Sequence, residues 1–174
     1  MEILWIISLI NRNISSNINK NILIFEDDCF ICNIDLFDER WEKIKFWLDN
    51  NSDKWDIFNG GPTGVEQSKK LILLNDELKL IEIEVGKTTN FIYYNRNSID
   101  KILKWNPDNN IAFDNFNIWN NEIKIITTFP YLTIQYSSYS DICNKEIDLY
   151  MRFKNSQKMI AKYFNFPIEK KLRK

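Results

Sequence analysis

Residues 22–28 read "ILIFEDD", and much of the organisation of the chain can be inferred from this short segment. Its first four residues are all apolar, which is typical of a short internal β-strand. Glu26, Asp27 and Asp28 follow at once, although adjacent carboxylates repel one another and are costly to bury without partners. Because ligands of open α/β sheets bind outside the carboxyl ends of the strands, the segment predicts a strand that ends at a ligand site.

Helical and strand patterns alternate along the rest of the chain. Asp35 can cap a helix that runs to about Asn50, in which apolar residues recur at helical spacing. Further apolar or alternating runs predict strands at residues 55–58, 71–74, 79–85, 91–94 and 122–129, and helices at 3–12, 98–105 and from about 144. This alternation predicts a single layered α/β domain over residues 1–174, with a mixed sheet and a helical C-terminal tail.

Composition and charge exclude several classes of protein. The 174 residues are 44% hydrophobic, and the net charge of −1 lacks the basic footprint of a nucleic-acid binder. Histidine is absent from the sequence, which excludes His-based catalytic triads and zinc sites that need imidazole. Cys29, Cys32 and Cys143 are odd in number and include a single CxxC spacing, so we expect free thiols in a reducing compartment.

The first ten residues, "MEILWIISLI", are too short an apolar run to cross a bilayer, which takes about 20 residues. They also lack the basic start and the small-residue cleavage site of a signal peptide. We therefore expect a buried amphipathic helix here, no membrane span, and a soluble, cytoplasmic protein.

Divalent-cation binding is the chemistry that the acidic cluster favours. Carboxylates held close together keep their charge when a cation shares their site. Mg²⁺ and Mn²⁺ prefer oxygen ligands and commonly bridge one or two carboxylates to the phosphates of a substrate. Residues 26–28 therefore suggest a metal that holds a diphosphate, and a solvated loop start or a helix cap is the alternative.

Four further segments follow the acidic one in a definite order. They are "KWDIFNGG" (54–61), "TTNFIYYNRNSIDKIL" (88–103), "FDNF" (113–116) and "FPYLTIQYSSYSDI" (129–142). In this order and spacing the chain, over about residues 1–142, resembles glycosyltransferase family 25, which holds lipopolysaccharide-type sugar transferases and collagen galactosyltransferase-like enzymes. The resemblance implies a GT-A-like (Rossmann-like) domain of three layers. It also implies transfer of a sugar from a nucleotide-sugar donor to a hydroxyl of a glycan or protein acceptor, with inversion.

The resemblance implies roles for individual residues as well. Asp28 is the expected direct ligand of Mn²⁺ or Mg²⁺, with Glu26 beside it. Contacts to the donor are expected from four residues, Asp27, Gly60, Gly61 and Gln135. Asp114 matches the lone Asp of the family and is the candidate base that an inverting displacement needs, or else a loop or helix-capping residue. Asp141 is expected to contact the acceptor or to have a structural role.

Some of these segments also have purely structural interpretations. Residues 60–61 belong to a Gly/Pro loop that either lets a ligand approach the backbone or simply turns the chain. Trp55 and Asp56 either brace the sheet, which we favour, or contact the ligand. Clustered acids with metals also serve phosphotransferases and nucleases, although "GGPTGVEQSKK" lacks the spacing of a phosphate-binding loop.

The front of the chain departs from the family pattern. Family members carry a strand, a helix with a Ser-His pair and part of the nucleotide pocket before the acidic motif, whereas 25 residues precede Glu26 here. "LWIISLINRNI" matches only the end of that helix, so we expect an N-terminally shortened domain. Three explanations stay open: a shortened relative that binds a donor, an inactive binding or scaffold subunit, or one piece of a split enzyme. Because an exposed strand edge invites association, we expect a homo-oligomer or a partner chain.

Overall fold

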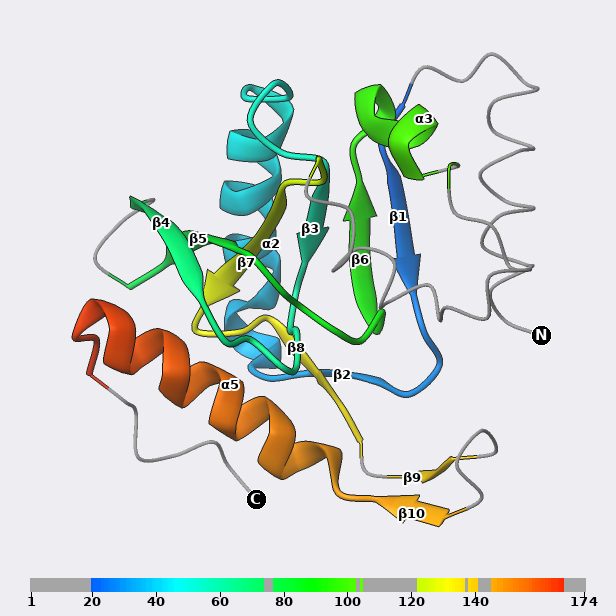
Figure 1. The fold of residues 1–174 in the computed structure, drawn as a ribbon, viewed down its shortest axis with the longest axis vertical. Helices are drawn as coiled ribbons and strands as arrows, with labels where there is room; N and C mark the ends of the chain where they lie inside the picture. The colour runs from blue at the N-terminus through cyan, green and yellow to red at the C-terminus, as the bar shows by residue number, and fades with distance from the viewer. Residues whose placement is uncertain are drawn as a thin grey trace.

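The computed structural model describes residues 20–73, 77–102, 104, 122–136, 138–140 and 145–167. Its centre is a six-stranded sheet with the strand order β1-β6-β3-β7-β5-β4 (Figure 1). In that order the strands span Ile22–Phe25, Phe91–Tyr94, Ile57–Asn59, Ile125–Phe129, Lys79–Ile83 and Ser68–Leu73. β3 and β7 are parallel and the other neighbouring pairs are antiparallel, which confirms the predicted α/β class with a mixed sheet.

Two small antiparallel pairs lie outside this sheet. β2 (Cys29–Ile31) pairs with β8 (Thr133–Gln135), and β9 (Ser138–Ser140) pairs with β10 (Lys145–Ile147). β10 occupies the start of the segment that the sequence predicted as a helical tail. The tail helix itself, α5 (Leu149–Phe164), follows directly.

Helix α2 (Ile34–Asp49) covers one face of the sheet (Figure 1). Its N-cap is Asn33, whose side chain accepts a backbone hydrogen bond from the first turn. The predicted cap, Asp35, lies within that turn instead, where the helix dipole still favours an acid. Ile44 and Leu48 are fully buried and belong to a core that also holds aromatic side chains of β3 and β6.

The opposite face carries a second core, to which α5 and the short helix α3 (Ile99–Ile102) contribute; α3 follows the 3₁₀ turn η1 (Arg96–Ser98). Strand β6 shows the division, because its first and third residues belong to the α2 core and its second and fourth to the α5 core. This alternation places helices on both faces of the sheet. None of the helices within the described ranges has the length and apolarity needed to cross a membrane. The helix predicted at residues 3–12 lies outside the described residues.

Strand β1 lies at an edge of the sheet, so the prediction of an internal strand was wrong. Among the described strands it pairs with β6 alone. Ile24 is 5% exposed, but Leu23 and Phe25, which face the α2 layer, are 37% and 47% exposed. The prediction failed because a short apolar run shows that both faces of a strand suit burial, but not how many neighbours the strand has.

Candidate functional site

The acidic segment lies at an edge of the sheet where several strands end together. β6 is antiparallel to both β1 and β3, and β3 is parallel to β7, so β1, β3 and β7 all run in one direction. Their carboxyl ends are followed by Glu26, Gly60 and Pro130, while Asn90 stands at the start of β6 on the same edge. The acids therefore lie at the carboxyl edge of the sheet, as the sequence predicted.

Glu26 is held by the loop that leads into β6 and by the first residue of β2. Its backbone N–H donates to the Asn90 carbonyl at 3.0 Å, and its side-chain Oε1 accepts from the Thr89 hydroxyl. Its carbonyl accepts from the Cys29 N–H at 3.1 Å, which closes a tight turn over Asp27 and Asp28. Asp27 at the tip of this turn is exposed, whereas Glu26 and Asp28 are half-buried.

Asp28 combines one paired and one unpaired carboxylate oxygen. Oδ2 accepts a hydrogen bond from Gln135 Nε2, and the Asp28 carbonyl accepts from the Tyr136 N–H at 3.3 Å. Oδ1 is buried and has no hydrogen-bond partner among the described residues. Because a buried acceptor without a donor costs free energy, a cation or donor that reached Oδ1 would relieve that cost.

The pairing of β2 with β8 explains why Gln135 reaches the acids. Cys29 lies opposite Gln135 and Ile31 opposite Thr133 in this antiparallel pair. The first residue of β2, which directly follows Asp28, therefore lies beside the last residue of β8. The sequence placed Gln135 at the site through the family pattern, and the structure does bring it to Asp28.

Gly60 and Gly61 have a structural explanation that needs no ligand. A Cβ on Gly60 would lie 2.9 Å from the Phe91 ring, and a Cβ on Gly61 would lie 1.8 Å from the Thr133 carbonyl oxygen. The Gly60 carbonyl also accepts from the Leu132 N–H at 2.9 Å. The segment around β8 packs directly against this loop, so both positions require glycine. Donor contact by the two glycines stays a prediction.

Polar residues that the sequence analysis gave no role line the same edge. Asn90 is fully buried; its Nδ2 donates to Thr133 Oγ1 at 3.3 Å, while its Oδ1 has no partner among the described residues. Thr88 has a φ of +71°, which is rare for a β-branched residue, and its hydroxyl donates to the Gly61 carbonyl at 3.2 Å. Asn59, the last residue of β3, joins the loop after β3 to the loop before β6, because its side-chain Nδ2 donates to the Thr88 carbonyl at 2.8 Å. A backbone outlier beside unpaired buried acceptors is typical of a functional edge.

Trp55 braces the sheet rather than the candidate site. It is 1% exposed, its indole Nε1 donates to the Leu48 carbonyl at 2.8 Å, and its ring stacks on Tyr93 with 5.5 Å between ring centroids. These contacts hold the segment that leads into β3 against the end of α2 and against β6.

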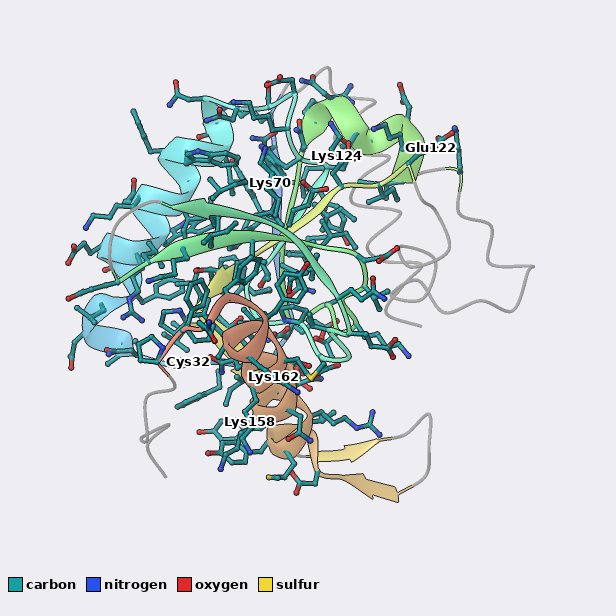
Figure 2. The ribbon with its side chains drawn as sticks, turned by 60° about the vertical axis from the view of Figure 1, so that its left-hand side comes forward. Cys32, Lys70, Glu122, Lys124, Lys158 and Lys162 are labelled. Atoms are coloured by element: carbon teal, nitrogen blue, oxygen red, sulfur yellow. The ribbon has the colours of Figure 1, made fainter. Side chains whose placement is uncertain are left out.

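Asp56 is a second bracing residue, as the sequence analysis favoured. It is 4% exposed and ion-paired with Lys101 on α3 at 3.0 Å. It also accepts from the Ser98 hydroxyl and, at 2.7 Å, from the backbone N–H of Lys124, which lies just before β7 (Figure 2). The carboxylate thus connects α3 to two strands, and each of its oxygens is paired.

The two cysteines of the turn region are free thiols with raised pKa values. Burial raises the pKa of Cys29 to about 11 and that of Cys32 to about 12. Both are free, which agrees with the expected free thiols, and Cys143 lies outside the described residues. Because the thiolate is the nucleophile and the metal ligand, neither thiol is suited to those roles at neutral pH.

The acidic turn offers at most two half-buried carboxylates, Glu26 and Asp28, to a cation. Within the described ranges, no group of three or more His, Cys, Asp or Glu side chains is placed to hold a metal ion. A cage made of protein ligands alone is therefore not seen there. Mg²⁺ and Mn²⁺ are often held by one or two carboxylates and the phosphates of a substrate, and the unpaired Oδ1 of Asp28 suits that arrangement. Asp114 and Asp141 lie outside the described residues, so their roles stay predictions.

The chain was compared with known proteins. No family model, curated protein or solved structure matches it. The resemblance to glycosyltransferase family 25 therefore depends on the quoted segments alone.

Proposed function

We propose that this chain is a metal-dependent glycosyltransferase with a GT-A-like fold. It would bind the diphosphate of a nucleotide-sugar donor, together with Mn²⁺ or Mg²⁺, at the edge where β1, β3 and β7 end. The observation that carries the proposal is the buried, unpaired Oδ1 of Asp28 at this edge. The order of the five sequence segments supports the same chemistry.

The residues around Asp28 position it for this task. The Gln135 amide holds Oδ2, which fixes the carboxylate and leaves Oδ1 to face the cation. The Thr89 hydroxyl holds Glu26 in the same way, so the two half-buried acids of the turn have fixed orientations. When bound, the cation offsets the negative charge that develops on the leaving nucleoside diphosphate.

An inverting transfer also needs a carboxylate that accepts the proton of the acceptor hydroxyl. Asp114 is our candidate because it matches the lone Asp of the family pattern. Asp27, Gly60, Gly61 and Gln135 remain the proposed donor contacts, and Asp141 the proposed acceptor or structural residue.

A binding or scaffold subunit without catalysis is the second candidate. Structural roles of the segment "KWDIFNGG" favour it. Trp55 and Asp56 brace the sheet, and Gly60 and Gly61 are required by close packing, so this part of the resemblance to the family has an explanation without a ligand. Such a protein would fold normally and release no nucleoside diphosphate from any nucleotide sugar.

Thermal unfolding with a donor screen separates the two candidates. A ligand that binds only the native state at 100 times its Kd adds about 2.7 kcal/mol, which raises the Tm of a domain of this size by roughly 5–10 °C. We expect such a rise with Mn²⁺ plus a nucleoside diphosphate in the wild type and in Asp38→Ala, an exposed control on α2, but not in Asp28→Ala. Release of nucleoside diphosphate from one nucleotide sugar in the screen would establish turnover. Equal shifts in wild type and Asp28→Ala would contradict the proposal.

A further inference from the structure

Among the described strands, β1 has a neighbour on one side only, so its other edge is open to pairing within that part of the chain. Its four residues, Ile22–Phe25, are all apolar, and its register with β6 has no bulge. The other edge strand, β4, carries the exposed Lys70 (Figure 2) and an irregular register between Ser68 and Lys70. Charges and bulges are the features that keep an edge strand from pairing with another chain. β4 has both, and β1 has neither.

The backbone groups that face outward from β1 can be identified. The Glu26 N–H bonds to the Asn90 carbonyl, and in an antiparallel pair such bonded positions alternate. Ile22 and Ile24 therefore bond to β6, and the backbone groups of Leu23 and Phe25 face away from the sheet. Any strand that adds to this edge must bond to those two residues.

The charges at the two ends of β1 select a partner. Lys20 precedes the strand, and Glu26 follows it. If a second β1 lies antiparallel with Leu23 opposite Leu23, then Lys20 of each copy lies opposite Glu26 of the other. This register also pairs outward-facing positions with each other, as hydrogen bonding requires. A parallel arrangement would instead bring the acidic ends together, and like charges directly opposite are unfavourable.

A hollow of about 450 Å³ lies beside β1, between β1, β6 and α2. Its walls are part apolar and part charged, and they are formed by Lys20, Asn21, Leu23, Trp41, Lys45, Asp49 and Tyr93. The rings of Trp41 and Tyr93 give a second aromatic side chain a surface to pack on. In the antiparallel register, Phe25 of the second copy lies opposite Asn21. Residues that oppose one another share a face of the sheet, so this Phe25, whose ring is 47% exposed in one copy, points toward the hollow.

We propose that two copies of this chain pair through antiparallel β1 strands, with Leu23 on the twofold axis. The edges join into one continuous sheet, each Phe25 fills the hollow of the other copy, and each Lys20 pairs with Glu26 across the interface. The contact is isologous, so every interaction occurs twice. Because four residues from each copy make a smaller contact than a standard interface, the dimer dissociates on dilution.

Sedimentation of the full chain over a range of concentrations, combined with crosslinking, tests the pairing. In a Cys143→Ser background, Leu23→Cys is expected to give a covalent dimer under mild oxidation, because the two positions face each other on the axis. Lys70→Cys on the protected edge is the matched control and is expected to stay monomeric. A wild type that is monomeric at every concentration, or equal crosslinking by both variants, would overturn the proposal.

A charge-exchange cycle tests the register without a ligand. Lys20→Glu and Glu26→Lys are each expected to weaken the dimer at least tenfold, and the double variant is expected to regain dimerisation. Circular dichroism of each variant establishes that it is folded. Recovery in the double variant supports the antiparallel register, whereas a dimer unaffected by either single change would contradict it. No donor is needed in these experiments, so their failure would not bear on the proposed transferase.

Discussion

Gln135 and Asp28 are 107 positions apart in the sequence, yet the amide of Gln135 donates a hydrogen bond to Oδ2 of Asp28. The antiparallel pair of β2 and β8 makes this contact possible by aligning Cys29 with Gln135. The bond decides which carboxylate oxygen remains for a ligand. It therefore links the fold of the small two-stranded sheet to the chemistry of the acidic turn.

Gln135→Glu is predicted to place two carboxylates where one amide–carboxylate bond now exists. The repulsion raises the pKa of this pair in the folded state above its unfolded value. The variant is therefore least stable at neutral pH, and its deficit against wild type shrinks as the pH falls and one acid binds a proton. Urea unfolding at pH 7.5 and pH 4.5 measures this difference. Gln135→Met, which removes the amide without adding charge, should show a smaller recovery at low pH, because only the lost hydrogen bond raises the pKa of Asp28.

Gly61→Ala is predicted to destabilise the protein by about 3 kcal/mol, at the upper end for overpacking, because its Cβ would lie 1.8 Å from the Thr133 carbonyl oxygen. Gly64→Ala is a useful comparison, since its Cβ meets only the Lys87 side chain but its φ is +66°. That strain costs about 1–2 kcal/mol. Denaturant unfolding compares the two. A Gly61→Ala variant of wild-type stability that had lost nucleotide binding would show that the glycine serves the ligand instead.

Asp56→Ala is predicted to cost about 2–4 kcal/mol, because it leaves the Lys124 N–H and the Ser98 hydroxyl without their acceptor. Lys101→Met should cost less than Asp56→Ala, because Asp56 keeps its bonds from the Lys124 N–H and the Ser98 hydroxyl when the ion pair is lost. Equal losses in the two variants, measured by urea unfolding, would mean that the ion pair and not the backbone bond carries the stability.

The free energy of unfolding is predicted to fall as the pH rises above about 9. Burial raises the folded-state pKa of Cys29 to about 11 and of Cys32 to about 12, from the ordinary value of 9.0. The stability that the two protonated thiols contribute is therefore fully present below pH 9, where the unfolded thiols are also protonated. It is lost as the pH rises from 9 through the folded-state pKa values. Unfolding at pH 7.5 and pH 10 should show a smaller loss in Cys29→Ala/Cys32→Ala than in wild type. Rapid reaction of both native thiols with a thiol reagent at pH 7.5 would contradict their burial.

The sequence predicted those parts of the fold that depend on residues close together along the chain. Helix α2 follows from apolar spacing, and the acids after β1 follow from the junction of an apolar run with a polar turn. The position of β1 at the edge could not be predicted, because the number of neighbours of a strand depends on the whole chain. β2, β8, β9 and β10 are each three residues long, which is too short for a periodic signal.

The candidate site was likewise predictable from the sequence only in part. The acids and Gln135 came from the sequence pattern, but the choice between the two oxygens of Asp28 is a product of tertiary contact. Asn90 and Thr88 gave no usable signal, because a buried amide and a strained backbone become visible only when the loops around them are in place. The glycines gave a signal, and the structure supplies a packing reason for it.

Isothermal titration of a nucleoside diphosphate into the protein, with and without Mn²⁺, tests the role of Asp28 most directly. We predict one binding site that requires Mn²⁺, is retained in Asp38→Asn, and is weakened at least tenfold in Asp28→Asn. Binding of equal strength in wild type and Asp28→Asn, or no binding by wild type of any nucleoside diphosphate tried, would contradict the assignment of Asp28 as the metal ligand.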